Sequence, residues 1–213
     1  MVYDMNPQMK ERIERTIRNL EKHNIHGLFV ADENELRMKL QEWIPEGSTV
    51  AVGDSMTLSE TGIIEMLRNG NYHFLDKYRP GITRAEKQDI YRRSFSADTF
   101  LCSTNALTET GELYNVDGNG SRVAAMIYGP DQVIVVAGIN KIVKNLEEAE
   151  ERVRKTAAPL DAKRLQKKTP CVSLGYCVDC QSDDRICNDV VIIKRQFVKG
   201  RIKVIIVGKS LGY

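Results

Sequence analysis

Four cysteines are clustered near the C-terminal end of the sequence. They are Cys171, Cys177, Cys180 and Cys187, with five, two and six residues between successive members. Cysteine thiolates bind zinc and iron–sulfur clusters, and a C-x2-C pair occurs in both kinds of site. Clustered cysteines in a reducing compartment hold metal more often than they form disulfides. The spacing therefore predicts a metal site, with a [4Fe–4S] cluster and Zn²⁺ as candidates and free or disulfide-linked cysteines as the remaining interpretation.

A second set of polar residues lies in the middle of the chain, between the apolar runs 99–102 and 132–137. Open α/β sheets bind ligands where buried strands end in polar, glycine-containing turns, because such turns offer free N–H groups and allow a close approach of the backbone. We therefore expect a small-molecule site here. Its candidate residues are Asn105, Thr108, Glu109, Thr110, Gly111, Gly120, Ser121, Arg122 and Lys141.

Glu109 is the candidate for a reactive carboxylate in this stretch. It follows an expected strand and lies beside two threonines and a glycine. A carboxylate nucleophile needs nearby N–H donors that stabilise the oxyanion, and such a turn can supply them. The alternative is that Glu109 only caps or braces the turn, as glutamates in polar turns often do.

Arg122 and Lys141 are candidates for binding a carboxylate or a phosphate. Arginine offers two parallel donors and lysine a point charge. With Arg122 on the carboxylate of a 2-hydroxy or 2-oxo acid, Asn105 or Ser121 could hydrogen-bond the hydroxyl or carbonyl group. The alternative for both cations is an ordinary solvated position on the surface.

The segment Gly53-Asp54-Ser55-Met56-Thr57 follows another apolar run and precedes a helical pattern. A glycine and hydroxyl side chains at the start of a helix can form a cradle for an anion, because unpaired N–H groups and the positive end of the helix dipole meet there. Gly53, Asp54, Ser55 and Thr57 therefore join the expected ligand site. The alternative is that the glycine only lets the chain turn.

Composition limits the class of protein. The chain has 213 residues, of which 42% are hydrophobic, and its net charge is +2 without a long run of one sign. We expect one well-filled domain with or without an appendage, no nucleic-acid partner, no membrane span and a cytoplasmic location. Cys102 lies in an apolar run and is expected in the core.

Apolar runs alternate with helical patterns along the chain, which predicts an α/β fold with an open, mostly parallel sheet. Pro159 is expected to break a helix that starts near Asn145. The β-branched runs Val190–Ile193 and Ile202–Val207, joined through Lys199-Gly200, predict a hairpin. We expect a ligand-binding domain over residues 1–168 and a cysteine loop with terminal strands over residues 169–213, packed on the same domain.

A combination of motifs resembles the lactate-utilisation (LUD) domain family over residues 9–207. The motifs are Gly53-Asp54-Ser55-x-Thr57, Ser103-x-Asn105-Ala106-x-Thr108-Glu109-Thr110-Gly111, Gly120-Ser121-Arg122, Gly129-Pro130 and Asn140-Lys141-Ile142-Val143. The resemblance implies a fold akin to the sugar-phosphate isomerase and CoA-transferase superfamily, and a link to bacterial operons that oxidise lactate to pyruvate. Longer family members carry ferredoxin-type cysteine repeats, which this sequence lacks. The redox context favours [4Fe–4S] over Zn²⁺ at the four cysteines.

Two functions follow as hypotheses from this resemblance. The first is a component of lactate oxidation that binds a small carboxylate or a 2-hydroxy acid and works with a redox protein partner. The second is a CoA- or acyl-transferase-like enzyme in which Glu109 attacks a thioester, as a glutamate does in the related CoA transferases, or a regulatory protein that binds a sugar phosphate. The sequence leaves open whether the chain is itself catalytic.

Overall fold

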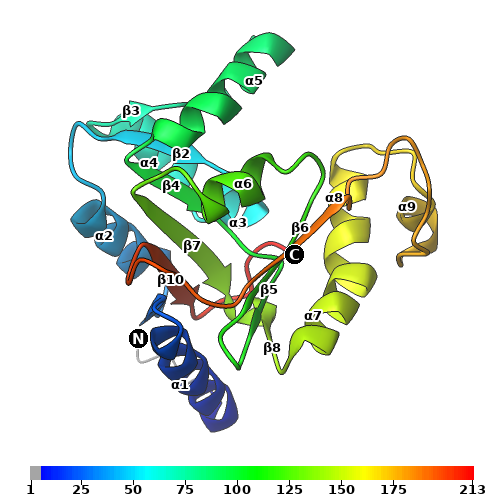
Figure 1. Cartoon of the computed structure of the whole chain (residues 1–213), viewed down its shortest axis with the longest axis horizontal. Coiled ribbons are helices and arrows are strands. Elements are labelled where there is room, and N and C mark those ends of the chain that lie inside the picture. The colour runs from blue at the N-terminus through cyan, green and yellow to red at the C-terminus, as the bar shows by residue number, and fades with distance from the viewer. Residues whose placement is uncertain (1–5) are drawn as a thin grey trace.

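A six-stranded parallel sheet forms the centre of the molecule (Figure 1). The computed structural model describes residues 6–213. The strand order is β1, β10, β7, β4, β2, β3, and every neighbouring pair runs parallel. The bounds are β1 (His26–Val30), β2 (Thr49–Val52), β3 (His73–Phe74), β4 (Thr99–Cys102), β7 (Gln132–Gly138) and β10 (Ile202–Val207). The expected α/β fold with an open parallel sheet is confirmed.

Helices cover both faces of this sheet. One face packs against apolar side chains of α1 (Pro7–Lys22), α5 (Arg84–Arg93) and α6 (Ser121–Ile127). The other face packs against α2 (Glu33–Trp43), α3 (Met56–Glu60) and α4 (Ile63–Asn69). Strands buried on both faces are continuous apolar runs, and β4 is an example, with all four residues buried.

The starts of several helices are fixed by side-chain caps that the sequence indicates. Asn6 caps α1, with Pro7 at the first helical position, and Asp32 accepts hydrogen bonds from two N–H groups of α2. Thr83 and Glu86 form a reciprocal capping box at α5. These caps determine the residue at which each helix begins.

The polar stretch in the middle of the chain contributes to a second, smaller sheet that the sequence analysis does not predict. Its order is β8 (Ile142–Val143), β5 (Ala106–Thr108), β6 (Leu113–Asp117) and β9 (Asp189–Ile193). Residues expected to form two polar turns therefore include two short strands. Their apolar side chains pack against α7 (Leu146–Arg152) and the helical turn that follows it.

The expected C-terminal hairpin is wrong. β9 pairs antiparallel with β6 in the small sheet, whereas β10 lies between β1 and β7 in the main sheet and is parallel to both. Burial explains the separation. Five of the six residues of β10 are buried, whereas only one of the five residues of β9 is. A strand that is apolar on both faces is stable only in the middle of a sheet that is covered on both sides.

The helix after the small sheet continues past the expected break. α7 leads through a π-helical turn, Val153–Ala157, into α8 (Ala158–Arg164), and Pro159 lies in the first turn of α8. The wider turn accommodates the proline, which has no N–H group to donate. α7, α8 and the short α9 (Pro170–Leu174) lie together beside the small sheet, with α9 at the outer edge (Figure 1). Within residues 6–213, no helix has the length and apolar character needed to cross a membrane.

Candidate functional site

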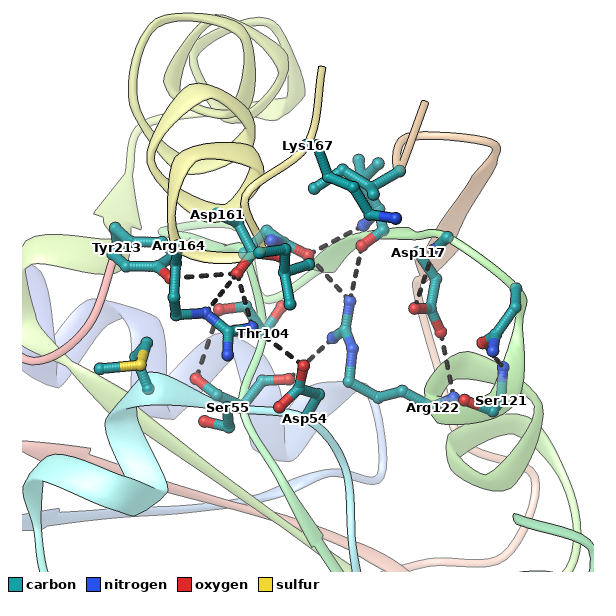
Figure 2. Close-up of a pocket in the computed structure, with 18 of the residues that line it drawn as sticks. Asp54, Ser55, Thr104, Asp117, Ser121, Arg122, Asp161, Arg164, Lys167 and Tyr213 are labelled. Atoms are coloured by element: carbon teal, nitrogen blue, oxygen red, sulfur yellow. Dashed lines mark hydrogen bonds and ion pairs between the residues drawn. The ribbon is translucent and has the colours of Figure 1, made fainter. Parts of the chain in front are cut away.

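A polar cavity of about 350 Å³ lies where the strands of the main sheet end. Asp54 and Ser55 follow β2, Lys77 lies just beyond β3, and Ser103, Thr104 and Asn105 follow β4. The α8 side chains of Asp161 and Arg164 face Asp54 and Ser55, and Arg122 approaches from α6 (Figure 2). This edge of an open parallel sheet is where α/β proteins bind their ligands.

The cavity wall is strongly charged, with an excess of positive groups. Three acidic side chains line it, those of Asp54, Asp117 and Asp161. Six cationic side chains line it, those of Lys77, Arg122, Lys141, Arg164, Lys167 and Arg185. A cavity lined mainly by one sign of charge raises the local concentration of ligands of the opposite sign. The wall is therefore suited to an anion.

Lys141 is buried beneath this wall. Only 3% of the residue is exposed, and its Nζ donates to the hydroxyls of Thr57 and Ser103, each at 3.0 Å. Burial lowers the pKa of Lys141 to about 7, and the nearby charges of Arg152 and Arg122 act in the same direction. Near pH 7 the amine is therefore partly neutral, and the two hydroxyl groups hold it in place.

Lys77 is a second buried cation, and the sequence analysis missed it. It is 4% exposed, and its Nζ lies 5.1 Å and 5.5 Å from the ring centres of Tyr78 and Tyr91. In the described part of the chain, no buried side-chain nitrogen or oxygen lacks a hydrogen-bond partner, so the Lys77 ammonium is not sealed off; it faces the cavity and forms no ion pair with a carboxylate. Burial lowers the pKa of Lys77 to about 8, while the charges of Asp54 and Asp117 oppose the shift. Its position in a basic turn directly after an expected strand was the available signal.

Arg122 lines the cavity and is held by four hydrogen bonds from the ends of its guanidinium group. Nη1 donates to the Ser103 carbonyl at 2.9 Å and to Asn115 Oδ1 at 2.7 Å. Nη2 donates to Asn105 Oδ1 at 3.0 Å and to the Val116 carbonyl at 2.8 Å. All four terminal N–H groups are thus bound to the protein, so the guanidinium connects the ends of β4 and β6. Arg122 gives the cavity a positive charge, but protein acceptors already occupy the N–H groups with which it could bind a carboxylate in a bidentate manner.

On the opposite side of the cavity, Asp54 connects the turn after β3 with helix α8. Its carboxylate accepts from Tyr78 Oη at 2.8 Å and from Arg164 Nη2 at 2.9 Å. Burial alone would raise the pKa of Asp54, but Lys77, Arg164 and Tyr78 outweigh it and hold the pKa below its usual range. Arg164 also pairs with Asp161, which accepts from the Tyr213 hydroxyl at 3.0 Å. Helix α8 and the C-terminal residue are thereby fixed over the end of β2.

The structure brings about half of the expected site residues together. Those that line the cavity are Asp54, Ser55, Asn105, Ser121, Arg122 and Lys141. Those that do not are Gly53, Thr57, Thr108, Glu109, Thr110, Gly111 and Gly120. Thr57 still contributes by accepting a hydrogen bond from Lys141, and Ser55 caps α3 by accepting from the Leu58 N–H group.

Glu109 does not line the cavity. Its carboxylate pairs with Arg12 Nε at 2.6 Å and with Arg15 Nη1 at 3.2 Å, both on α1. Its carbonyl accepts from Asn19 Nδ2 at 2.8 Å. The turn packs against the same helix, because a Cβ atom at Gly111 would lie 2.9 Å from the Asn19 backbone. These contacts correspond to the bracing role named as the alternative for Glu109.

The four clustered cysteines line a second, very small cavity of about 10 Å³, with Arg185 and Ile186. All five cysteines are free thiols. Within residues 6–213, no group of three or more histidine, cysteine or acidic side chains is arranged so that it could hold a metal ion as it stands. Cys102 is fully buried in β4, and burial raises the pKa of its thiol to about 12. It is a core residue, as expected.

Comparison with known proteins identifies the family. A family model described as "LUD domain" matches residues 13–207. The chain belongs to the LUD-domain family. Membership in this family suggests a function related to lactate utilisation.

Two solved structures that are similar to this LUD domain share little sequence identity with it. One is a DUF162 family protein from Deinococcus radiodurans, which is 14% identical with a TM-score of 0.50; the match covers 94% of this chain and 98% of that one. Another is eIF2B beta from Chaetomium thermophilum, which is 13% identical with a TM-score of 0.37, over 53% of this chain and 43% of that one. The first likeness supports the fold of the LUD domain. No curated protein matches the sequence.

Proposed function

We propose that this LUD domain binds a small carboxylate, a 2-hydroxy or 2-oxo acid of the lactate and pyruvate class, in the polar cavity. The observation that carries the proposal is the excess of cations at the cavity wall, six against three carboxylates, among them the largely buried Lys77, whose ammonium contacts two tyrosine rings and, within residues 6–213, forms no ion pair. A buried charge is unfavourable unless it is paired. A ligand carboxylate in the cavity would supply that partner.

Lys141 gives the proposed ligand a second contact of a different kind. Its pKa of about 7 allows it to donate to an acid's carbonyl oxygen or to accept a proton from a hydroxyl group. Ser103 and Thr57 hold the amine in place. The cavity thus combines a cation for the carboxylate with a proton donor and acceptor for the neighbouring oxygen, which are the two features that a 2-hydroxy acid presents.

Participation in lactate utilisation would also require a partner. Oxidation of a 2-hydroxy acid to a 2-oxo acid releases two electrons and two protons, and the electrons must pass to an acceptor. The redox protein partner expected from the sequence would be that acceptor. Glu109 adds no support for the acyl-transfer alternative, because two arginines of α1 hold its carboxylate outside the cavity.

A phosphorylated ligand is the second candidate, and the size of the cavity favours it. A volume of about 350 Å³ exceeds what a three-carbon acid fills. Arg164, Lys167 and Arg185 line the cavity in addition to Lys77 and Lys141. These extra cations would suit a phosphate group on a longer molecule.

Titration calorimetry with lactate, pyruvate and a sugar phosphate tests the proposal. We expect saturable binding of a 2-hydroxy or 2-oxo acid, weakened roughly tenfold or more by Lys77→Met, because a charge-assisted contact is lost. Lys10→Met, an exposed lysine on α1, is the matched control and should leave the affinity unchanged. Preference for the sugar phosphate would favour the second candidate. Equal effects of both substitutions would contradict a role for Lys77.

A further inference from the structure

The four clustered cysteines come from separate points of one loop and meet at one place. Cys171 lies on α9, and the other three lie between α9 and β9. All four line the same small cavity, which Ala158 at the start of α8 and Thr169 help to close. Seventeen residues of sequence therefore deliver four sulfur ligands to one point beside α8.

The backbone of the loop is shaped around these sulfur atoms. The Asp179 N–H group donates to Cys177 Sγ at 3.3 Å, and Thr169 Oγ1 lies 3.2 Å from Cys171 Sγ. Asp179 has a φ of +49° and Gly175 a φ of +80°, so the chain turns in the left-handed region on both sides of Cys177. Backbone N–H groups that donate to sulfur stabilise a thiolate, which is the form that binds metal.

Arg185 holds the remaining part of the loop. Its Nη1 donates to the Cys180 carbonyl at 2.7 Å, its Nε donates to the Cys187 carbonyl at 3.0 Å, and it pairs with Asp179 at 2.8 Å. One side chain thus fixes the backbone at two of the four cysteines. The loop keeps its shape without a disulfide, and its thiols remain available.

We propose that Cys171, Cys177, Cys180 and Cys187 together bind one Zn²⁺ ion. Four thiolates around one centre are a tetrahedral ligand set that zinc prefers. As the loop stands, the space between the cysteines is about 10 Å³, close to that of one ion or water, so a cube of four irons and four sulfides would require a larger change of the loop than one ion does. Because a single ion requires the smaller rearrangement of the loop, we propose zinc rather than the [4Fe–4S] cluster that the redox context favours.

Zinc binding is coupled to a rearrangement of the loop. Within residues 6–213, no group of three or more histidine, cysteine or acidic side chains is arranged to hold an ion, so the sulfur atoms must shift when the ion binds. Metal binding that draws its ligands together adds its free energy to the stability of the segment. Residues 171–187 become more resistant to local opening in the zinc form.

The zinc loop also forms one wall of the ligand cavity. Arg185 and Ile186 line both cavities, and they lie directly before Cys187. Zinc binding thus sets the position of a cationic side chain in the ligand cavity. This consequence rests on the proposed ligand binding, whereas the zinc site itself does not.

The first experiment measures metal in the full chain. Protein purified under reducing conditions should contain about one zinc per chain and be colourless. Cys187→Ser should lower the zinc content about tenfold or more, whereas Cys102→Ala should keep it, because Cys102 lies in β4 away from the loop. A brown protein with several irons per chain would overturn the single-ion assignment. Loss of zinc in Cys102→Ala but not in Cys187→Ser would overturn the assignment of the ligands.

A second measurement uses only the wild-type chain, so it does not depend on the folding of a variant. Co²⁺ added to the metal-free protein should give the intense visible absorption of tetrahedral thiolate coordination, and one equivalent of Zn²⁺ should abolish it. Trypsin should cleave at Arg185 about tenfold faster in metal-free protein than in the zinc form. Failure of Co²⁺ and Zn²⁺ to bind the reduced protein would overturn the site, whatever the affinity for a carboxylate. Equal cleavage rates would overturn the coupling of zinc binding to the order of the loop.

Discussion

Lys77 and Lys141 are placed so that a bound anion changes their protonation. Burial lowers the pKa of Lys77 to about 8 and that of Lys141 to about 7, so part of each amine is neutral at pH 8. A carboxylate in the cavity favours the charged forms and raises both pKa values. Binding and proton uptake are therefore linked at this site.

This linkage predicts a pH dependence of ligand binding. The affinity for a 2-hydroxy or 2-oxo acid should fall as the pH rises from 6 to 9, because a neutral amine attracts the anion less strongly. At pH 8, binding should take up a fraction of a proton to about one proton per ligand, and at pH 6 almost none. Calorimetry in buffers of different ionisation enthalpy measures this uptake, and Lys141→Met should reduce it. Binding at pH 8 without proton uptake would contradict a contact between the ligand and these amines.

At the scale of single residues, the sequence predicts a location well when that location depends on the nearest strand end or helix start. Asp54, Ser55, Asn105 and Ser121 follow the ends of strands or begin a helix, and they line the cavity as expected. Glu109 has equally suitable neighbours in the sequence, but its side chain turns to α1, which lies far away in the chain. The partners of a charged residue depend on tertiary packing, and a local pattern does not contain that information.

At the scale of elements, Glu109 and Gly111 dock the turn between β5 and β6 onto α1. Two arginines approach the carboxylate, and a glycine with a φ of +94° allows the helix backbone to come close. α1 therefore contacts both the main sheet and the small sheet. The ion pair orders this junction rather than the ligand cavity.

Glu109→Gln should consequently reduce stability without affecting the ligand. The substitution removes the charge that faces Arg12 and Arg15, and we expect a loss of about 1–3 kcal/mol in the free energy of unfolding. Denaturant unfolding measures this loss, and titration with the ligand of the wild type should give an unchanged affinity. Glu11→Gln, whose partner Arg15 is exposed, serves as the control and should change stability by less than about 1 kcal/mol. A lost affinity with unchanged stability would instead assign Glu109 to the ligand site.

The main-sheet strands are well predicted because each is a short apolar run between polar turns. β4 and β10 have the expected bounds, and β7 ends one residue later than its apolar run. β5 and β8 were missed because they have only three and two residues, and β6, which has five, was missed because it lies in a segment rich in polar and turn-forming residues. Such strands form only when a neighbouring strand and a covering helix are present, so their stability comes from tertiary contacts.

At the scale of the whole molecule, the last strand of the chain pairs with the first strand. β10, close to the C-terminal end, lies between β1 and β7 and completes the centre of the main sheet. The residues after β10 then reach the cavity, where Tyr213 contacts Asp161. Adjacent apolar runs favour a hairpin on local grounds, but β10 gains more by burying both of its faces under helices. The order of strands is thus decided by burial that only the complete chain provides.

This arrangement predicts unequal effects for two isoleucines in strands that follow each other in the sequence but lie in different sheets. Ile205 in β10 is fully buried in the main sheet, whereas Ile192 in β9 is 38% exposed on the small sheet. Ile205→Ala should lower the free energy of unfolding by about 2–5 kcal/mol, because it leaves a cavity among side chains that cannot collapse around it. Ile192→Ala should lower it by less, since part of the side chain already contacts water. Urea unfolding of the two variants measures the difference. Equal losses would be expected of a hairpin whose strands are buried alike, and would contradict a central β10.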